Sequence, residues 1–349
     1  MAGPEQDSGF EVIGDGVIDD RDRRRGPLPS EPAAGAGTGF VEPVSEAAAA
    51  AWADALASFR SWWFWLAGAA ALGISWGLAA AVVAVGEANG WFETSVPTAV
   101  YLLMGAWLSI AAAVLGTLWG FRRPQPRMAG MLLSGLLRGV AFALLSGAVL
   151  ALVAVAAGGP IALAGAAVVV VAVEVGLFGL MGAGCRACFA HTVPAAVLAG
   201  LLLLLLGMGN LAAAVLLLPG TMATGQASVP VNVQRDAAGR ITAFECVGQL
   251  HTVEVANTDR VAWMAASNPA MIYSALGAGA VPAEDPSAWI LSGLQWAADG
   301  PQRDVPCLDG ESSANLPPSS PVVLTGLMIQ GALASLVLIP GRMLSARRR

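Results

Sequence analysis

Lysine is absent from this 349-residue chain, so all 18 basic residues are arginines. A nucleotide-binding P-loop needs a lysine that reaches the phosphates. The chain therefore lacks that motif, and any use of ATP would depend on a second polypeptide. Charge is also scarce, because only 12% of the residues are charged while 56% are hydrophobic. A soluble domain of this size needs a more highly charged surface, so the sequence predicts an integral membrane protein.

Residues that support catalysis or metal binding are few. The chain has two histidines, and neither belongs to a recognisable hydrolase or metalloenzyme pattern. Cys185, Cys188 and His191 have a suggestive spacing, but they offer three ligands where a structural zinc site needs four. We therefore expect no enzyme activity within the chain, no metal and no cofactor. We also expect no nucleic-acid partner.

Six apolar stretches are long enough to cross ~30 Å of hydrocarbon as helices. They cover residues 62–85, 98–120, 128–157, 160–181, 193–218 and 322–340. Arginines near the span ends fall in alternate loops, which by the positive-inside rule places both termini in the cytoplasm. The all-arginine, alanine-rich composition is typical of a GC-rich bacterial genome, so we expect a multi-pass protein of a bacterial plasma membrane, in contact with lipid.

The predicted fold is an all-α polytopic membrane protein with six transmembrane helices and a small α+β extracytoplasmic domain between helices 5 and 6. The expected parts are a disordered cytoplasmic tail (1–45), a juxtamembrane helix (46–61), transmembrane helices 1–5 (62–219), the extracytoplasmic domain (220–320), and helix 6 with a basic tail (321–349).

The extracytoplasmic segment has its own local signals. Two strands are expected around the turn at 236–239 and a third strand over 251–257, followed by three helices. Asn268 precedes a proline and Asp285 precedes another, so each is placed to cap a helix. Cys246 and Cys307 are the only cysteines of this segment. In an oxidising compartment we expect them to form a disulfide.

Arg138, Glu174 and Asn210 are the candidate functional residues inside the predicted spans. Arg138 of the third span and Glu174 of the fourth lie at similar depths on consecutive antiparallel helices, so an ion pair is geometrically reasonable. A lone charge at the bilayer centre costs ~2.5–3.5 kcal/mol on insertion scales. Arg138 has the alternative of snorkelling to the headgroups. The pair would either hold helices together or line a pathway, and the same two roles are open to Asn210 of the fifth span.

Glycines recur at four-residue spacing in several spans, which lets helix backbones approach closely. The pairs are Gly73 and Gly77, Gly116 and Gly120, and Gly135 and Gly139. We interpret them as contacts within the helix bundle.

The order of these parts resembles that of an ABC-2 type exporter permease. Residues 176–209, beginning "GLFGLMGAGCRACFAH", resemble the passage from the fourth to the fifth span of such permeases. Residues 263–282, "WMAASNPAMIYSALGAGAVP", resemble the Asn-Pro segment before their last span. The resemblance implies a separate ATP-binding subunit, assembly as a homodimer or heterodimer, and docking of the ATPase on the loop after the second span.

That loop carries Arg122, Arg123 and Arg127, which are therefore candidate ATPase contacts; simple positive-inside anchoring is the alternative. The leading functional hypothesis is the permease subunit of an ATP-driven exporter for a lipid-like, peptide or drug-like compound. The second hypothesis is a non-transporting envelope protein that carries an extracytoplasmic disulfide-bonded sensor or assembly domain. Closely packed spans favour the first hypothesis, and the external segment favours the second.

Overall fold

The structure, a computed structural model, describes residues 44–90, 95–122, 128–235, 241–282, 284–312 and 320–348. All of them belong to one unit that begins at Pro43. The tail expected over residues 1–45 lies outside the described residues except for its last two.

Six helical segments of the described chain are long and apolar enough to cross a membrane, which confirms the predicted number of spans. Five of them are simple helices: α2 (Trp62–Ala88), α3 (Val96–Arg122), α4 (Met128–Ala157), α5 (Ala162–Cys188) and α12 (Val322–Arg347). The fifth span is composite and consists of α6 (Thr192–Leu204), a π-helical turn (Leu205–Gly209) and α7 (Asn210–Leu217).

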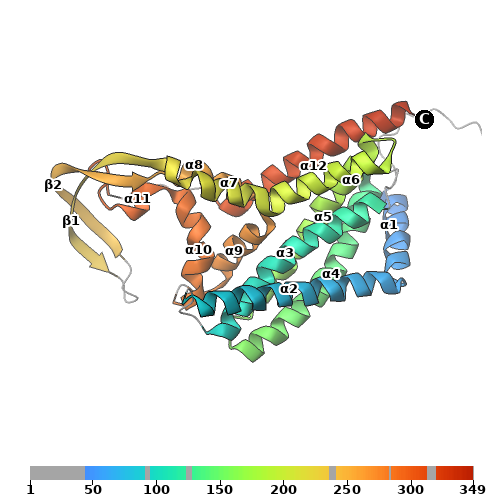
Figure 1. The fold of residues 1–349 in the computed structure, drawn as a ribbon, viewed down its shortest axis with the longest axis horizontal. Helices are drawn as coiled ribbons and strands as arrows, with labels where there is room; N and C mark the ends of the chain where they lie inside the picture. Colours follow the sequence, from blue (N-terminus) through green and yellow to red (C-terminus); the bar gives the residue numbers. More distant parts are fainter. Residues whose placement is uncertain are drawn as a thin grey trace, which may run out of the picture. The chain divides into compact units, whose positions relative to one another are not determined.

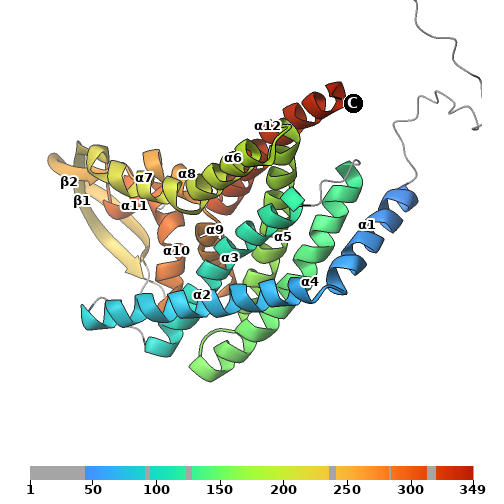
Figure 2. The same cartoon turned by 45° about the vertical axis from the view of Figure 1, so that its right-hand side comes forward.

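Helix α5 is the centre of the bundle and packs against α3, α4, α6, α9 and α12 (Figures 1 and 2). Glycines make these approaches close. A Cβ on Gly120 of α3 would lie 1.9 Å from the Gly179 carbonyl oxygen of α5, and one on Gly139 of α4 would lie 2.8 Å from the Ala172 carbonyl oxygen. By contrast, a Cβ on Gly73 or Gly77 of α2 would meet nothing within 4 Å.

The predicted juxtamembrane helix is present as α1 (Val44–Phe59). It packs mainly against α4 rather than against the adjoining span α2. Ala51 and Ala55 are fully buried on one face of α1, because their small side chains let the two helices approach closely.

Three helices between the fifth and sixth spans begin where the sequence predicts. They are α8 (Asp259–Ala266), α9 (Pro269–Ala280) and α10 (Pro286–Asp299), and the short α11 (Pro301–Asp304) follows. The Oδ1 atoms of Asn268 and Asp285 accept hydrogen bonds from the first-turn amides of α9 and α10, both at 2.8 Å. The predicted N-caps are therefore confirmed.

Helix α9 packs against α3 and α5 as well as against α10. Its Tyr273 is fully buried, and a Cβ on Gly105 of α3 would lie 2.3 Å from the Tyr273 side chain. This part of the expected extracytoplasmic domain therefore shares the hydrophobic core of the membrane-spanning helices.

The segment after the fifth span forms a two-stranded antiparallel hairpin of β1 (Met222–Arg235) and β2 (Ile241–Ala256). The prediction of separate second and third strands is wrong, because β2 runs through both. Three residues of β2 between Val247 and His251 lie opposite one residue of β1, and Gly248 adopts a positive φ of 98° within this bulge. Glycine adopts that conformation without steric cost, so the strand continues past the irregularity.

The predicted disulfide between Cys246 and Cys307 is present, with a Cα–Cα distance of 5.4 Å and a sequence separation of 61 residues. Next to it, the Ser228 amide donates to the Cys307 carbonyl oxygen at 3.1 Å, and Ala227 forms a β-bridge with Leu308. The bridge therefore ties the hairpin to the chain that follows α11.

Replacing both Cys246 and Cys307 by serine is expected to destabilise this segment by about 4 kcal/mol on the chain-entropy model for a loop of this length. Limited proteolysis of the purified protein measures the effect as faster cleavage within the hairpin. The same change made at the free cysteines Cys185 and Cys188 is the control and should leave hairpin cleavage unchanged. Equal cleavage rates for the two double variants would contradict a stabilising role for the disulfide.

Candidate functional site

Arg138 of α4 is buried, with 4% of its surface exposed, and its partners lie on α1. Its Nη2 atom forms an ion pair with Asp54 Oδ2, and its Nε donates to Ser58 Oγ at 2.9 Å. Asp54 and Ser58 are four residues apart, so they share a face of α1. The juxtamembrane helix therefore neutralises the one charged side chain in the middle of α4.

The predicted ion pair between Arg138 and Glu174 is not formed. The two residues do lie at similar depths, since Gly139 lies against Ala172 of α5. The sequence does not show, however, toward which neighbouring helix Glu174 points. Glu174 is two residues from Ala172, which is about 200° around the helix axis. It therefore points away from α4, toward α12.

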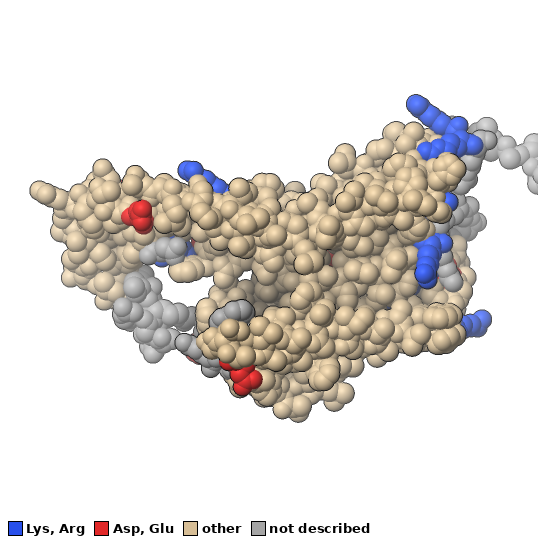
Figure 3. Space-filling model, viewed as in Figure 1, with Lys and Arg blue, Asp and Glu red and all other residues tan. Residues whose placement is uncertain are grey.

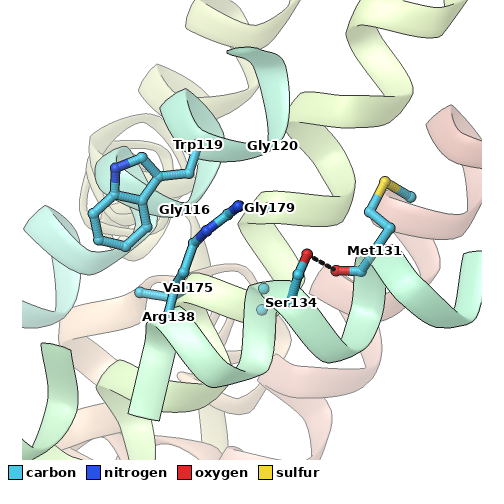
Figure 4. Close-up of a pocket in the computed structure, with 10 residues that line it drawn as sticks. Gly116, Trp119, Gly120, Met131, Ser134, Arg138, Val175 and Gly179 are labelled. Atoms are coloured by element: carbon cyan, nitrogen blue, oxygen red, sulfur yellow. Dashed lines mark hydrogen bonds between the residues drawn. The ribbon is translucent and has the colours of Figure 1, made fainter. Parts of the chain in front are cut away.

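Arg138 also borders a small cavity between α3, α4 and α5, shown in Figure 4. The cavity holds about 10 Å³, which is room for roughly one water molecule. Half of its ten lining residues are glycines, and the Ser134 hydroxyl beside Arg138 donates to the Met131 carbonyl oxygen at 3.3 Å. This space is too small for a substrate, so we interpret Arg138 as a residue that holds α4 to α1.

A second buried polar cluster lies around the turn between α8 and α9. Gln330 of α12 donates from Nε2 to Glu174 Oε1 at 3.1 Å and to the Ser267 carbonyl oxygen at 3.0 Å. Asn210 at the start of α7 donates to Ser267 Oγ at 2.7 Å. These four side chains and Asn268 are called the polar network below.

Asn268 connects the polar network to the irregular part of the fifth span. Its Nδ2 donates to the Gly207 carbonyl oxygen at 2.6 Å, while its Oδ1 caps α9. A π-helical turn shifts the backbone hydrogen bonds of a helix, and such turns are frequent at functional sites. The Asn268 amide thus links the π-helical turn, to which its Nδ2 donates, with the first turn of α9, from which its Oδ1 accepts.

The polar network contains two of the three predicted intramembrane residues, Glu174 and Asn210, and joins them to α12 and to the α8–α9 turn. Sequence reasoning missed Gln330, Ser267 and the contact of Asn268 with Gly207. Gln330 was the available signal, since it is the single amide within the last apolar stretch. Glu174 Oε2 and Gln330 Oε1 are buried without a hydrogen-bond partner among the described residues.

A large groove borders the polar network. It has a volume of about 610 Å³ and lies between α3, the π-helical turn and α7, with α9 and Val82 of α2 completing the lining. Trp107, Met208 and Leu211 contribute large apolar walls. Gly207 and Asn268 line the groove while also bonding to one another. Apart from Asn268 the lining side chains are apolar, so the groove suits an apolar ligand of ordinary size.

Arginines gather at one end of the described unit, the end at which α12 finishes, as Figure 3 shows. Arg122, Arg347 and Arg348 are exposed there. Arg348 Nη2 donates to the Cys188 carbonyl oxygen at 2.5 Å, which links the ends of α12 and α5. The other two candidate ATPase contacts, Arg123 and Arg127, lie outside the described residues.

No protein-family model, curated protein or solved structure matches this chain.

Proposed function

We propose that the chain is the membrane-spanning subunit of a transporter that moves an elongated apolar compound, with ATP hydrolysis supplied by a separate subunit. The observation that carries the proposal is the groove of about 610 Å³ between the second and fifth candidate spans. Its lining is apolar apart from Asn268, so its occupant would be a lipid-like molecule or another apolar compound.

The π-helical turn beside the groove is a candidate for the part of the chain that moves during transport. One wall is the π-helical turn, whose Gly207 carbonyl oxygen is held by the side chain of Asn268 rather than by the helix alone. Turns of this kind are frequent at functional sites, and a carbonyl oxygen that is held by a side chain can lose that contact without the unfolding of a helix. Rearrangement of this contact would change the width of the groove.

The energy source must lie elsewhere, because a chain without lysine has no P-loop lysine. We place the arginine-rich end in the cytoplasm by the positive-inside rule, and the hairpin outside the cell. The ATPase would dock at that end, where Arg122 is exposed.

Affinity purification of the full chain from native membranes tests this proposal. An ATPase with a lysine-containing P-loop should co-elute, and its hydrolysis in reconstituted liposomes should rise with an added apolar compound. Hydrolysis that stays flat with a panel of phospholipids and hydrophobic dyes, or the absence of any co-eluting ATPase, would contradict it.

A variant that narrows the groove tests whether the groove is the site at which the compound binds. Ala212→Phe places a ring in the groove and should raise the compound concentration needed for half-stimulation by about tenfold or more, the range expected when a ligand group loses its fitted space. Val197→Phe is the control, because Val197 is 57% exposed on the same span and does not line the groove. Both variants should retain the ATPase, and equal stimulation by both would show that the groove is not the compound's site.

The alternative, a non-transporting envelope protein, is favoured by the disulfide-bonded hairpin. Val229 and Val247 form a cross-strand pair, and both are more than half exposed. Under this alternative the hairpin binds a partner and the spans serve as an anchor. Deleting residues 222–256 would then abolish function, whereas a permease of the proposed kind would keep its stimulated ATP hydrolysis.

A further inference from the structure

Glu174 has an unusual environment for a carboxyl group. It is fully buried near the middle of α5, and no ion pair of the described residues includes it. Its single hydrogen bond comes from the neutral amide of Gln330. A buried charge without a counter-ion is costly in hydrocarbon, and a buried carboxyl group usually becomes neutral instead.

The described residues around Glu174 offer too few hydrogen-bond donors. The Gln330 amide has two N–H groups, and both are used, one on Glu174 Oε1 and one on the Ser267 carbonyl oxygen. Glu174 Oε2 and Gln330 Oε1 are then two buried acceptors with no donor among the described residues. A carboxylate can only accept, whereas a protonated carboxyl group has one O–H to donate. One proton on Glu174 Oε2 therefore removes the buried charge and turns one of the two unsatisfied acceptors into a donor.

Other charged or titratable side chains on the elements packed against α5 do not replace that proton. Helices α3, α4, α9 and α12 carry Tyr101, Arg122, Arg138, Tyr273, Arg342 and Arg347. Arg138 is paired with Asp54, and Tyr101 donates to the Pro160 carbonyl oxygen at 2.9 Å. Arg122, Arg342 and Arg347 lie in the last turns of α3 and α12, far along their helices from the level of Glu174. The Tyr273 hydroxyl has no hydrogen-bond partner among the residues that the structure describes, so it does not donate to Glu174.

We propose that Glu174 and Gln330 form a proton-binding site within the membrane-spanning bundle, in which Glu174 is protonated while α12 and the Ser267 turn are packed against α5. Loss of the proton leaves a buried carboxylate, so it requires α12 to separate from α5 and admit water. Proton release and opening of the polar network are thus one event. The inference holds whether or not the chain is a permease.

Infrared spectroscopy of the full chain in lipid vesicles tests this directly. At neutral pH the wild-type protein should show the carbonyl band of one protonated carboxyl group, and Glu174→Gln should lose it. Glu87→Gln is the control, because Glu87 is exposed on α2, and that variant should keep the band. A wild-type spectrum that contains only carboxylate bands at neutral pH would overturn the proposal.

Two further measurements keep the test decisive if Glu174→Gln fails to fold. Wild-type protein labelled with ¹³C-glutamate should retain one label-shifted acid band at mildly alkaline pH, where solvated glutamates are ionised. Gln330→Leu should shift that band, because its hydrogen-bond donor is lost, whereas Ser335→Ala on the exposed face of α12 should not. A labelled band that is absent, or that is indifferent to Gln330→Leu, would refute the assignment.

Discussion

Gly120→Ala is expected to prevent α3 from packing on α5. The added Cβ would lie 1.9 Å from the Gly179 carbonyl oxygen, and backbone atoms on both sides leave no flexible side chain to give way. Overpacking of a core costs about 1–3 kcal/mol and sometimes more; we expect the upper end, because α5 is the helix on which four other membrane-spanning segments pack. Thermal unfolding in detergent, followed by size-exclusion chromatography, measures the loss.

Gly77→Ala is the matched control for this prediction. Gly77 also belongs to a four-residue glycine pair, but a Cβ there would meet nothing within 4 Å. Alanine is favoured over glycine inside a helix by roughly 0.5–1 kcal/mol, so the control should be unchanged or slightly more stable. If Gly120→Ala and Gly77→Ala lowered the stability equally, the close contact between α3 and α5 would not explain the loss.

Breaking the ion pair between α1 and α4 is the second change with a large expected effect. Arg138→Ala removes the guanidinium from Asp54, and Asp54→Ala removes the carboxylate from the buried Arg138 guanidinium. Removing one partner of a fully buried pair costs about 3–5 kcal/mol, and we expect the lower end because the Asp54 side chain is 20% exposed. The double variant Asp54→Leu with Arg138→Met should recover most of that loss, because no charge then remains unpaired.

The pair of Arg303 and Asp299 supplies the comparison. Its nitrogen–oxygen distance is 2.8 Å, with the Arg303 side chain 53% exposed and the Asp299 side chain 7% exposed. Pairs that open onto solvent contribute about 0–1 kcal/mol, and Asp299 keeps a hydrogen bond from Gln295 Nε2 at 3.0 Å. Arg303→Ala should therefore lower the melting temperature much less than Arg138→Ala does. A double-mutant cycle that finds no coupling between Asp54 and Arg138 would show that α1 is held to α4 by its alanine face alone.

The spans could be predicted from the sequence because each is a long apolar run, and about 20 consecutive apolar residues are enough for a helix to cross hydrocarbon. The helix starts at α9 and α10 could be predicted because Asn268 and Asp285 carry the capping information in one side chain. The disulfide could be predicted because Cys246 and Cys307 have no other cysteine in their segment.

The partners of the buried charges could not be predicted in the same way. Depth along a helix follows from counting residues, but direction around it depends on which neighbour packs where. Asp54 could not be predicted as the partner of Arg138, because it precedes the first span and nothing in the local pattern shows that α1 packs against α4. The link from Glu174 to Gln330 joins residues 156 positions apart, and only tertiary packing brings them together.

The extra backbone residue of the π-helical turn has a consequence for how the fifth span meets the bilayer. A π-type turn rotates everything beyond it by about one residue's share of the helical circuit, roughly 100°. The exposed apolar stripe of α6 therefore does not continue in line along α7. Because of this rotation, α7 can present Asn210 to Ser267 while α6 keeps an apolar surface.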